Sequence, residues 1–587
     1  MFKLLKRLNK REIVLIIIST IFIVLQVWLD LKLPDYMSEI TSLIQTKGTT
    51  VVDLLTPGGY MILCALGSLA SSFIVGYFAA NVAASFSKYL RRDVFRKVEE
   101  FGMEEIKKFS TGSLITRTTN DITQVQMIIS MGLQLVIKAP ILAIWAIYKI
   151  AGKNWQWSVV TGSAVLVLLI MITTLVLFAL PKFKIIQKLT DNLNKTTREN
   201  LIGIRVVRAY NAEKYQEKQF NKANNELTKT NMFTQRLMAM IPAIMPLIMS
   251  GLTLAIYFIG AYLIEEAQMA DKLGIFSNMV VFSSYAIQVV MAFMILAMIF
   301  IIYPRSAVSA KRILEVLNTE VSIKDGTIEK DVSTEKGTIE FKNVSFKYPD
   351  AEAYMLENIS FKVEQGETVA FIGSTGSGKS TLINLIPRFY DATEGVVLVD
   401  GINVKEYKQE YLHSKLGYIP QKAVMFSGTV QDNVAYGESL DMKITDQKVK
   451  EAIKVAQGSD FVEKMPKKYK THIAQGGTNV SGGQKQRLAI ARAIARNPEI
   501  YIFDDSFSAL DYKTDYTLRK ELREYTNDAT VLIVAQRIGS IINADKIIVL
   551  DNGKMVGMGT HKELFKKCKV YKEIALSQLS KEELENA

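Results

Sequence analysis

The chain has 587 residues, too many for one hydrophobic core, so two or more domains are expected. Hydrophobic residues make up 49% of it and the mean hydropathy is +0.15 although 22% of residues are charged, so the apolar residues must be concentrated in one part. The net charge of +13 fits a membrane protein with cytoplasmic Lys and Arg better than a nucleic-acid binder, because no basic groove interleaved with aromatic residues is present. The chain has two cysteines, Cys64 and Cys568, far apart in the sequence, so neither a disulfide framework nor a cysteine metal site is implied.

Six apolar runs in the first half of the chain predict membrane spans. The run Ile13–Leu29 follows a basic segment and no small-residue cleavage site follows it, which favours a span over a signal peptide. About 20 apolar residues suffice to cross ~30 Å of hydrocarbon. The further expected spans are Tyr60–Ala84, Gly132–Ile150, Ser158–Leu180, Ala239–Ile264 and Ile275–Tyr303.

The loops predict the orientation of these spans. Lys and Arg are frequent after the second and fourth spans, whereas the alternate loops are short or acidic. The positive-inside rule then places both termini in the cytoplasm, in what we expect to be a bacterial plasma membrane. Two long inner loops, 85–130 and 181–238, have helical composition and small-residue breaks at Phe109–Asp121 and Arg198–Glu213. These breaks are candidate docking points for a cytoplasmic domain, unless the loops merely extend the spans into water.

Lys138 lies well inside the third expected span, which also carries Lys149 next to its end. A bare ammonium facing lipid is costly, so this side chain either extends to the membrane surface or faces a wet cavity that could hold substrate. The last two spans are rich in Met, which is compatible with a surface that repacks around many ligands and equally with plain contact to membrane lipid.

The composition changes after Pro304, and an alternating strand–helix pattern begins near Gly337. The sequence therefore predicts a multidomain protein, with an all-α six-helix transmembrane domain followed by an α/β domain. The match to G-x-x-x-x-G-K-[ST] at Gly373–Ser380 makes this second domain a P-loop nucleotide-binding domain. The expected limits are 1–315 for the transmembrane domain, 316–336 for a linker and 337–587 for the nucleotide-binding domain.

A Gly-rich turn lies between an apolar strand, Val369–Ile372, and residues spaced as one face of a helix. It matches G-x-x-x-x-G-K-[ST], in which the backbone N–H groups and the helix N-terminus surround phosphates, the lysine reaches the β- and γ-phosphates, and the hydroxyl ligates Mg²⁺. The expected ATP-binding residues here are Gly373, Ser374, Thr375, Gly376, Ser377, Gly378, Lys379, Ser380 and Thr381.

Further motifs follow along the chain. A second Gly-rich turn, Val480–Arg487, opens a helical stretch, although a single site does not obviously need two such turns. The buried strand that ends at Asp504 offers a carboxylate for Mg²⁺. Tyr348 is a candidate to stack on adenine, and Gln421 follows a predicted strand and could join metal and water coordination.

Together these motifs resemble the half-transporters of the ATP-binding-cassette (ABC) exporter family over essentially the full length. The resemblance implies an ATP-hydrolysing translocase that uses ATP and Mg²⁺. It also implies two stacked cassettes, each ATP lying between one Walker A loop and the signature loop of the other subunit. The signature residues that would serve the partner's nucleotide are Ser481, Gly482, Gly483 and Gln484.

Two positions depart from the family pattern. Asp505 stands where the family has the Glu that polarises the attacking water, and it is one methylene shorter. Gln536 stands at the switch position, usually His, and cannot carry the charge of an imidazole. Both changes in one site, with the phosphate-binding elements intact, resemble the degenerate half of a heterodimeric exporter.

We therefore expect one subunit of a heterodimeric exporter of small amphipathic, drug-like compounds, paired with a second homologous half-transporter. A homodimeric lipid or peptide exporter and an exporter-fold siderophore importer are the alternatives, because the cassette does not encode cargo or direction.

Overall fold

The structure is a computed structural model that describes residues 2–46, 48–152, 154–269, 271–437, 443–526 and 528–585. They form two compact units. The first unit runs up to Glu99 and resumes at Thr111–Thr319, and the second consists of Glu100–Ser110 and the residues from Glu320 onward. The finer division at 315 and 336 remains a proposal.

The regular elements described in the first unit are all helices, and six of them are long and apolar enough to cross a membrane, which confirms the six expected spans. They exceed the apolar runs considerably, reaching 49 residues in α3 and 54 in α9. The bounds are α1 Phe2–Leu5, α2 Lys10–Gln45, α3 Val51–Glu99, α5 Thr111–Thr118, α6 Asn120–Ile150, α7 Trp155–Ile202, α8 Ile204–Ala209, α9 Glu213–Glu266 and α10 Lys272–Asn318.

Helix α10 continues through Pro304 to Asn318, so the charged stretch that follows the sixth expected span belongs to the same helix. Its last turns bury Ala310, Ile313 and Val316 completely. Their spacing places them on one face of a helix, so burial of that face favours continued helix beyond the proline.

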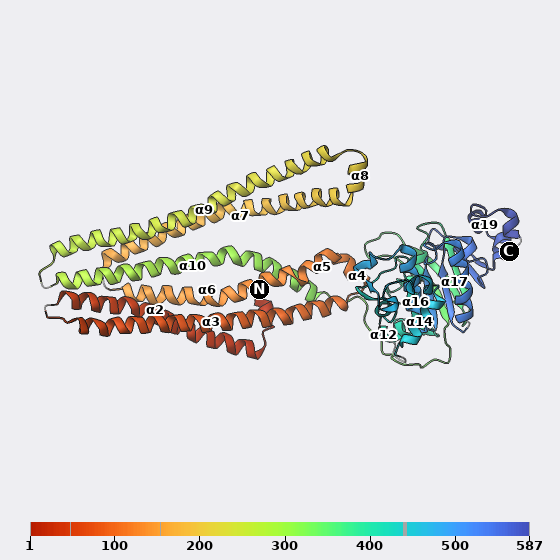
Figure 1. Cartoon of the computed structure of the whole chain (residues 1–587), viewed down its shortest axis with the longest axis horizontal. Coiled ribbons are helices and arrows are strands. Elements are labelled where there is room, and N and C mark those ends of the chain that lie inside the picture. The colour runs from red at the N-terminus through yellow and green to blue at the C-terminus, as the bar shows by residue number, and fades with distance from the viewer. Residues whose placement is uncertain are drawn as a thin grey trace. The chain divides into compact units, whose positions relative to one another are not determined.

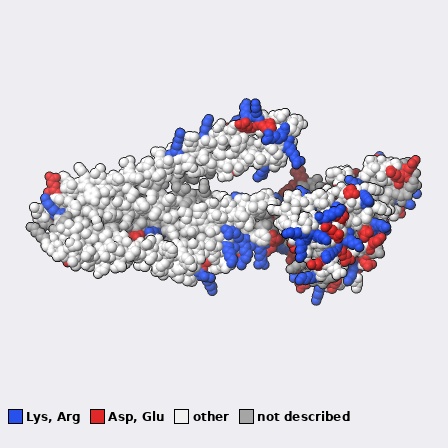
Figure 2. Space-filling view, in the orientation of Figure 1, with Lys and Arg blue, Asp and Glu red and all other residues white. Residues whose placement is uncertain are grey.

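Within the first unit, α2, α3, α6 and α10 pack together, and α7 and α9 run side by side and are joined by α8 (Figure 1). A buried cluster that includes Trp157, Phe282 and Tyr285 joins α7 to α10. Figure 2 shows most of this unit's surface free of charged residues, as expected for helices that face lipid.

The two inner breaks expected from sequence are short helices. Helix α4 (Met103–Phe109) is followed by Ser110, whose φ is 57°, and then by α5. Helix α4 belongs to the second unit, where the Glu105 carboxylate accepts from the backbone N–H of Ser322 at 2.9 Å. The second break becomes α8, which belongs to the first unit.

The second unit contains a six-stranded sheet in the order β12-β11-β3-β10-β9-β6, in which only β12 is antiparallel to its neighbour. A four-stranded antiparallel sheet has the order β2-β1-β4-β5, and β7 pairs with β8. The strands are β1 Ile339–Phe346, β2 Leu356–Val363, β3 Thr368–Gly373, β4 Glu394–Val399, β5 Ile402–Asn403, β6 Leu416–Ile419, β7 Gly428–Thr429, β8 His472–Ile473, β9 Ile500–Asp504, β10 Thr530–Val534, β11 Lys546–Asp551 and β12 Lys554–Gly559.

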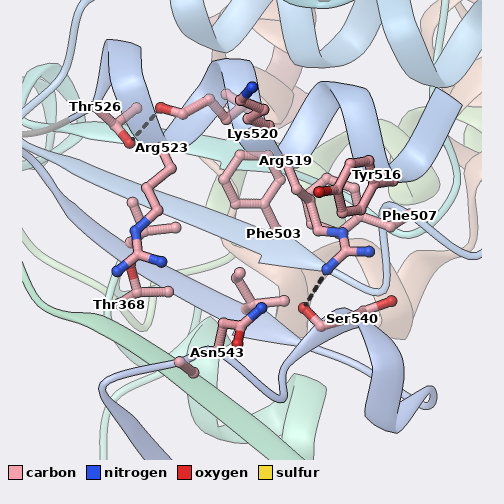
Figure 3. Close-up of a pocket in the computed structure, with 14 residues that line it drawn as sticks. Thr368, Phe503, Phe507, Tyr516, Arg519, Lys520, Arg523, Thr526, Ser540 and Asn543 are labelled. Carbon is pink, nitrogen blue, oxygen red and sulfur yellow. Dashed lines mark hydrogen bonds between the residues drawn. The ribbon is translucent and has the colours of Figure 1, made fainter. Parts of the chain in front are cut away.

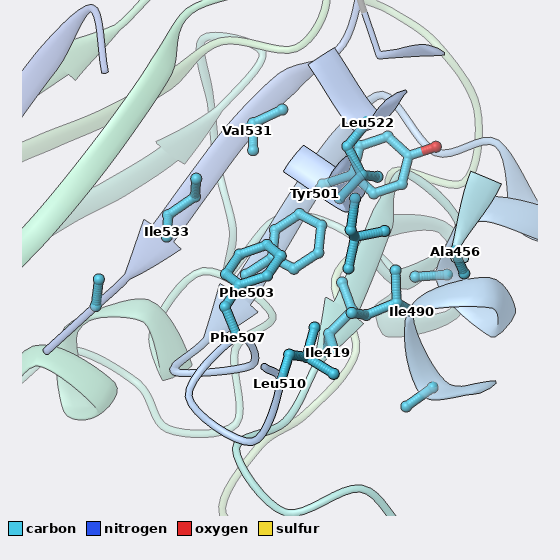
Figure 4. Close-up of a cluster of buried hydrophobic side chains, with 14 of the residues drawn as sticks. Ile419, Ala456, Ile490, Tyr501, Phe503, Phe507, Leu510, Leu522, Val531 and Ile533 are labelled. Atoms are coloured by element: carbon cyan, nitrogen blue, oxygen red, sulfur yellow. The ribbon is translucent and has the colours of Figure 1, made fainter. Parts of the chain in front are cut away.

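Both faces of the six-stranded sheet are buried. In β9, Tyr501 and Phe503 enter one core cluster, whereas Ile500 and Ile502 enter the other. Figure 4 shows the first cluster, in which Phe503 lies beside Phe507 with ring centroids 5.0 Å apart. Covering both faces explains why the strands read as continuous apolar runs rather than alternating ones.

Helices cover these faces and carry the motifs at their ends. The further elements of the second unit are α11 Lys379–Asn384, α12 Gln409–Ser414, α13 Val430–Val434, α14 Asp446–Val455, α15 Ser459–Val462, η1 Lys468–Lys470, η2 Gln475–Gly477, α16 Gly482–Arg496, α17 Tyr512–Tyr525, η3 Ile538–Ser540, α18 His561–Lys567, α19 Lys569–Leu576 and α20 Lys581–Glu585.

Candidate active site

The Gly-rich turn connects β3 to α11, as the sequence predicts. At Gly373 an added Cβ would lie 2.0 Å from the carbonyl oxygen of Leu550, so this position admits no side chain. Gly378 has φ of 96° and leads directly into α11, a backbone conformation that L side chains rarely adopt. These two glycines explain how the turn closes tightly enough to surround a phosphate.

Lys379 is curled back over its own loop. Its ammonium donates to the carbonyl oxygens of Gly373 and Ser374, both at 2.8 Å, and the side chain is buried. Burial lowers the pKa of Lys379, while the carboxylates of Asp505 and Asp504 act in the opposite direction. A phosphate arriving here would replace carbonyl contacts of the ammonium with stronger, charge-assisted ones.

Ser380 and Asp504 fit the predicted magnesium site. The Ser380 hydroxyl donates to a carboxylate oxygen of Asp504 at 2.7 Å, so two hard oxygen ligands from α11 and β9 already meet. Mg²⁺ commonly binds one or two such protein groups together with substrate phosphates and water. When bound here, Mg²⁺ would neutralise phosphate charge, and Ser380 and Asp504 would hold it.

Asp505 is the centre of a small hydrogen-bond network. Its carboxylate oxygen Oδ2 accepts from Gln421 Nε2 at 3.2 Å and from Gln536 Nε2 at 2.8 Å. Its φ is 47°, and its backbone N–H donates to Val534 at 3.0 Å. The structure therefore places the three residues expected to handle water and metal, from three separate loops, within hydrogen-bond reach of one oxygen.

The two adjacent carboxylates are both buried. Desolvation raises the pKa of Asp504, the Ser380 hydrogen bond lowers it, and the charge of Asp505 raises it further. Desolvation also raises the pKa of Asp505, opposed by hydrogen bonds from Gln421 and Ser508. Two buried carboxylates side by side favour the arrival of a cation.

Tyr348 lies beside the Gly-rich turn, where the sequence predicts the adenine contact. Its hydroxyl is 3.0 Å from the Thr381 hydroxyl, and its ring makes an edge contact with Tyr390 at a centroid distance of 5.3 Å. The ammonium of Lys107, from α4, lies 4.4 Å from the centre of the Tyr348 ring. Sequence reasoning missed Lys107, because it lies 241 positions before Tyr348 in the chain.

The signature residues begin α16. Ser481 caps this helix: its hydroxyl accepts from the Gln484 N–H at 3.3 Å, while its own N–H donates to the Gln484 side chain at 2.9 Å. Within the described chain, no hydrogen bond or ion pair joins Ser481, Gly482, Gly483 or Gln484 to the Gly-rich turn or to Asp504 and Asp505. The Gly-rich turn and the signature residues of this chain are therefore not joined into one site.

Sequence reasoning also missed Gln578, which supports the switch loop. Its side chain donates to the carbonyl oxygen of Gln536 at 2.8 Å and accepts from the Ile538 N–H at 2.8 Å. Because Gln578 follows α19 near the end of the chain, only the tertiary structure reveals this support.

A cavity of about 320 Å³ lies between α17 and the sheet (Figure 3). Phe503 and Phe507 line it, and Arg519 crosses from α17 to the switch region by donating to the carbonyl oxygen of Ser540 at 3.2 Å. The same guanidinium pairs with Asp515 at 3.0 Å, so Arg519 ties α17 to the turn that follows Gln536. The Arg519–Ser540 hydrogen bond therefore links α17, which begins directly after Asp511, to the loop that carries Gln536.

Lys138 has a partner that the sequence did not suggest. Its ammonium lies 3.2 Å from Asp30 Oδ2, so it pairs with a carboxylate on α2 instead of extending to the membrane surface. Whether this position contacts substrate remains a proposal.

The fold and the site define an ATP-driven membrane transporter with a helical membrane domain and a P-loop ATPase. Comparison with family models gives the family: residues 356–508 match ABC transporter, and residues 16–293 match ABC transporter transmembrane region. The chain belongs to the ABC transporter family and is an ABC exporter half-transporter whose nucleotide-binding domain is that of an ATP-hydrolysing transporter ATPase.

Known relatives align along nearly the whole chain. It is 38% identical over 560 residues to an ABC transporter ATP-binding protein of Mycobacterium tuberculosis (strain CDC 1551 / Oshkosh), covering 94% of this chain and 93% of the relative. It is 31% identical over 504 residues to an ATP-dependent lipid A-core flippase of Pseudomonas fluorescens (strain Pf0-1), covering 86% of this chain and 82% of the relative. A solved bacterial Atm1-family ABC exporter with ATP bound shares the fold, with a TM-score of 0.81, 23% identity and coverage of 96% and 98%.

Proposed function

We propose that the chain is one subunit of a heterodimeric exporter of amphipathic, drug-like compounds in a bacterial plasma membrane, with both termini in the cytoplasm. In this proposal its own site binds Mg²⁺–ATP and hydrolyses it slowly. The observation that carries the proposal is the contact of Gln421 and Gln536 with the same oxygen of Asp505.

A general base must accept a proton from the attacking water, within about 2.6–3.2 Å of it. Two amide N–H groups already occupy Oδ2 of Asp505, which leaves Oδ1 as the oxygen to accept that proton. The side chain is also one methylene short of the usual Glu, and a misplacement of about 1 Å can cost roughly 10²-fold in rate. Gln536 adds a neutral amide where the family has an imidazole. Together these features support slow hydrolysis at this site.

The signature loop supports a role for this chain at the partner's nucleotide. Gly483 lies in the first turn of α16, and an added Cβ would come no closer than 3.4 Å to the carbonyl oxygen of Ala509. This chain's own packing therefore tolerates a side chain at position 483. Because the fold of this chain does not itself need glycine at position 483, a second molecule that approaches the backbone closely would explain the residue. The partner's ATP would be such a molecule.

In the proposed cycle, ATP is held by Tyr348, Lys379 and Ser380 of this chain and covered by the partner's signature loop. The competent ATP is held by the partner and covered by Ser481–Gln484 of this chain. Closure of the two cassettes would then be transmitted to the membrane helices, which alternate between inward-facing and outward-facing states.

A homodimeric lipid exporter is the second candidate. It is supported by the relatives named ATP-dependent lipid A-core flippase in Pseudomonas fluorescens and Haemophilus influenzae, each 31% identical to this chain. Two copies of this chain would, however, carry two sites with Asp505 and Gln536.

The test is steady-state ATPase activity of the purified chain alone and of the chain co-purified with the half-transporter encoded beside it. We expect little activity from the chain alone and full activity from the pair, whose partner has Glu and His at the corresponding positions and an altered signature loop. Equal activity per cassette in both preparations would refute the heterodimer proposal and favour the homodimer.

A further inference from the structure

A cluster of polar side chains lies inside the membrane helices, away from the nucleotide site. Asp30 on α2 pairs with Lys138 on α6 at 3.2 Å, and Ser68 on α3 donates to the other oxygen of the same carboxylate. Gln288 on α10 lies beside them, with its Nε2 at 3.5 Å from the main-chain carbonyl oxygen of Asp30. Four helices therefore contribute to one polar cluster, named here the Asp30 cluster.

The Asp30 cluster lies among the membrane helices. Ser68, Lys138 and Gln288 lie inside the second, third and sixth expected spans, and Asp30 directly follows the first, Ile13–Leu29. Ionised groups in membrane helices are rare and commonly line a substrate path.

Two groups of the Asp30 cluster have unused hydrogen-bonding capacity. The Lys138 ammonium has three N–H donors, and Asp30 is its one partner among the described residues. Gln288 Oε1 is buried and has no hydrogen-bond partner in the described chain. About a quarter of each charged side chain is exposed, 24% for Lys138 and 27% for Asp30. The cluster thus presents unused donors and an unused acceptor, together with an accessible carboxylate.

In a neighbouring ion pair, Asp35–Lys149, both carboxylate oxygens have partners. Asp35 pairs with Lys149 at 2.7 Å, and its other oxygen accepts from the hydroxyl of Tyr285. Tyr285 is fully buried, and its hydroxyl also lies 2.9 Å from the main-chain oxygen of Leu31. Lys149 is one residue from the end of α6. This second pair holds helices together near the membrane surface, and it provides a matched control for the first.

We propose that Asp30, Lys138 and Gln288 form a recognition site for the zwitterionic head group of a lipid-like amphiphile. The ammonium of the ligand would meet Asp30 and Gln288 Oε1, and its phosphate or carboxylate would meet Lys138. The inference rests on the exporter function proposed above and specifies the class of its cargo.

Charge balance favours a zwitterion over a singly charged ligand. The Asp30–Lys138 pair is neutral as a whole, so a net cation or net anion would leave one uncompensated charge in a medium of low dielectric constant. A zwitterion exchanges one ion pair for two and keeps the total charge at zero. The site should therefore prefer phosphatidylethanolamine chemistry to phosphatidylglycerol chemistry.

The test uses the full chain with its natural partner, purified from its own membranes and reconstituted in vesicles. Stimulation of ATPase activity is measured with dihexanoylphosphatidylethanolamine, dihexanoylphosphatidylglycerol and hexadecyltrimethylammonium. We expect the unaltered protein to respond at lowest concentration to the zwitterion. Asp30→Asn should shift the preference toward the anionic lipid and Lys138→Gln toward the cationic amphiphile, each by roughly tenfold, as expected for loss of one charged hydrogen-bond partner.

Asp35→Asn is the matched control and should lower thermal stability without changing the order of preference. The exchanged double variant, Asp30→Lys with Lys138→Asp, keeps a pair and should keep the preference for the zwitterion if either single variant does not fold. Glycerophosphoethanolamine, which lacks acyl chains, should be at least about tenfold weaker than the lipid, because burial of apolar chains supplies much of the binding.

Unchanged preference in both Asp30→Asn and Lys138→Gln, with only lowered stability, would overturn the proposal and leave a structural ion pair. Equal potency of glycerophosphoethanolamine would overturn the lipid-like assignment. Basal ATPase activity without ligand reports on the nucleotide sites alone, so failure of the heterodimer proposal would appear there and not in the ligand preferences.

Discussion

Replacing Asp505 by Glu and Gln536 by His in the same chain should convert a slow nucleotide site into a fast one. Asp505 Oδ2 is held at 3.2 Å from Gln421 Nε2 and 2.8 Å from Gln536 Nε2. Glutamate extends the carboxylate by one carbon–carbon bond, about 1.5 Å. The exchange of Gln536 removes the shorter of the two amide contacts and supplies a ring that can carry charge.

The expected gain follows from these displacements. A shift of about 1 Å in a catalytic group is worth roughly 10²-fold, and a positioned general base contributes about 10²–10⁴-fold. We expect the double variant, purified alone, to hydrolyse ATP at least about tenfold faster than the unaltered chain, and Asp505→Glu alone to gain less because Gln536 remains. The assay is phosphate release at saturating Mg²⁺–ATP, with Lys379→Ala added to the double variant as the control that should abolish the gain. An unchanged rate in a double variant that still binds nucleotide would refute the reasoning.

Three further predictions follow from the same site. Lys379→Ala should abolish a slowly exchanging nucleotide that co-purifies with the heterodimer after turnover with labelled ATP, and rapid, equal exchange at both sites would contradict slow turnover here. Burial raises the pKa of Asp505 above its unfolded value, so the ionised carboxylate destabilises the folded state at pH values above the folded pKa. Asp505→Asn should therefore raise Tm at pH 8, and this gain should vanish as the pH falls through the folded pKa toward about 4. A gain in Tm that persists in acid would contradict this. Gln578→Ala removes both hydrogen bonds that support the switch loop, at Gln536 and Ile538. It should lower the free energy of unfolding of the second unit by about 1–3 kcal/mol and leave the membrane unit folded, as measured by thermal unfolding.

The order of spans and motifs could be predicted because each depends on a local pattern. Six apolar runs match six helices, and the Gly-rich turn before Lys379 lies between a strand and a helix as its pattern requires. The extent of the helices could not be predicted from hydropathy, because their polar ends are helical through packing and not through membrane contact. Helix α10 illustrates this, since it continues past Pro304 on a buried face.

Contacts between distant segments were beyond the sequence. The partner of Lys138 is Asp30, 108 positions away, and the amide groups around Asp505 come from loops 84 and 31 positions away. Lys107 also reaches Tyr348 only because α4 belongs to the second unit. Residue type suggested what Asp505 and Gln536 lack, but only the folded chain brings the amides of Gln421 and Gln536 to one oxygen of Asp505.

The central claim, that this chain's signature loop serves catalysis while its own carboxylate does not, is tested most directly by two substitutions in the proposed heterodimer after reconstitution. Gly483→Asp adds bulk and negative charge where the partner's triphosphate would lie, whereas Asp505→Asn changes a carboxylate already engaged by two amides. The measurement is steady-state ATPase activity at matched amounts of folded protein. We predict that Gly483→Asp nearly abolishes the activity and that Asp505→Asn retains most of it. Equal loss in the two variants would mean that the site of this chain is itself catalytic, and would contradict the account.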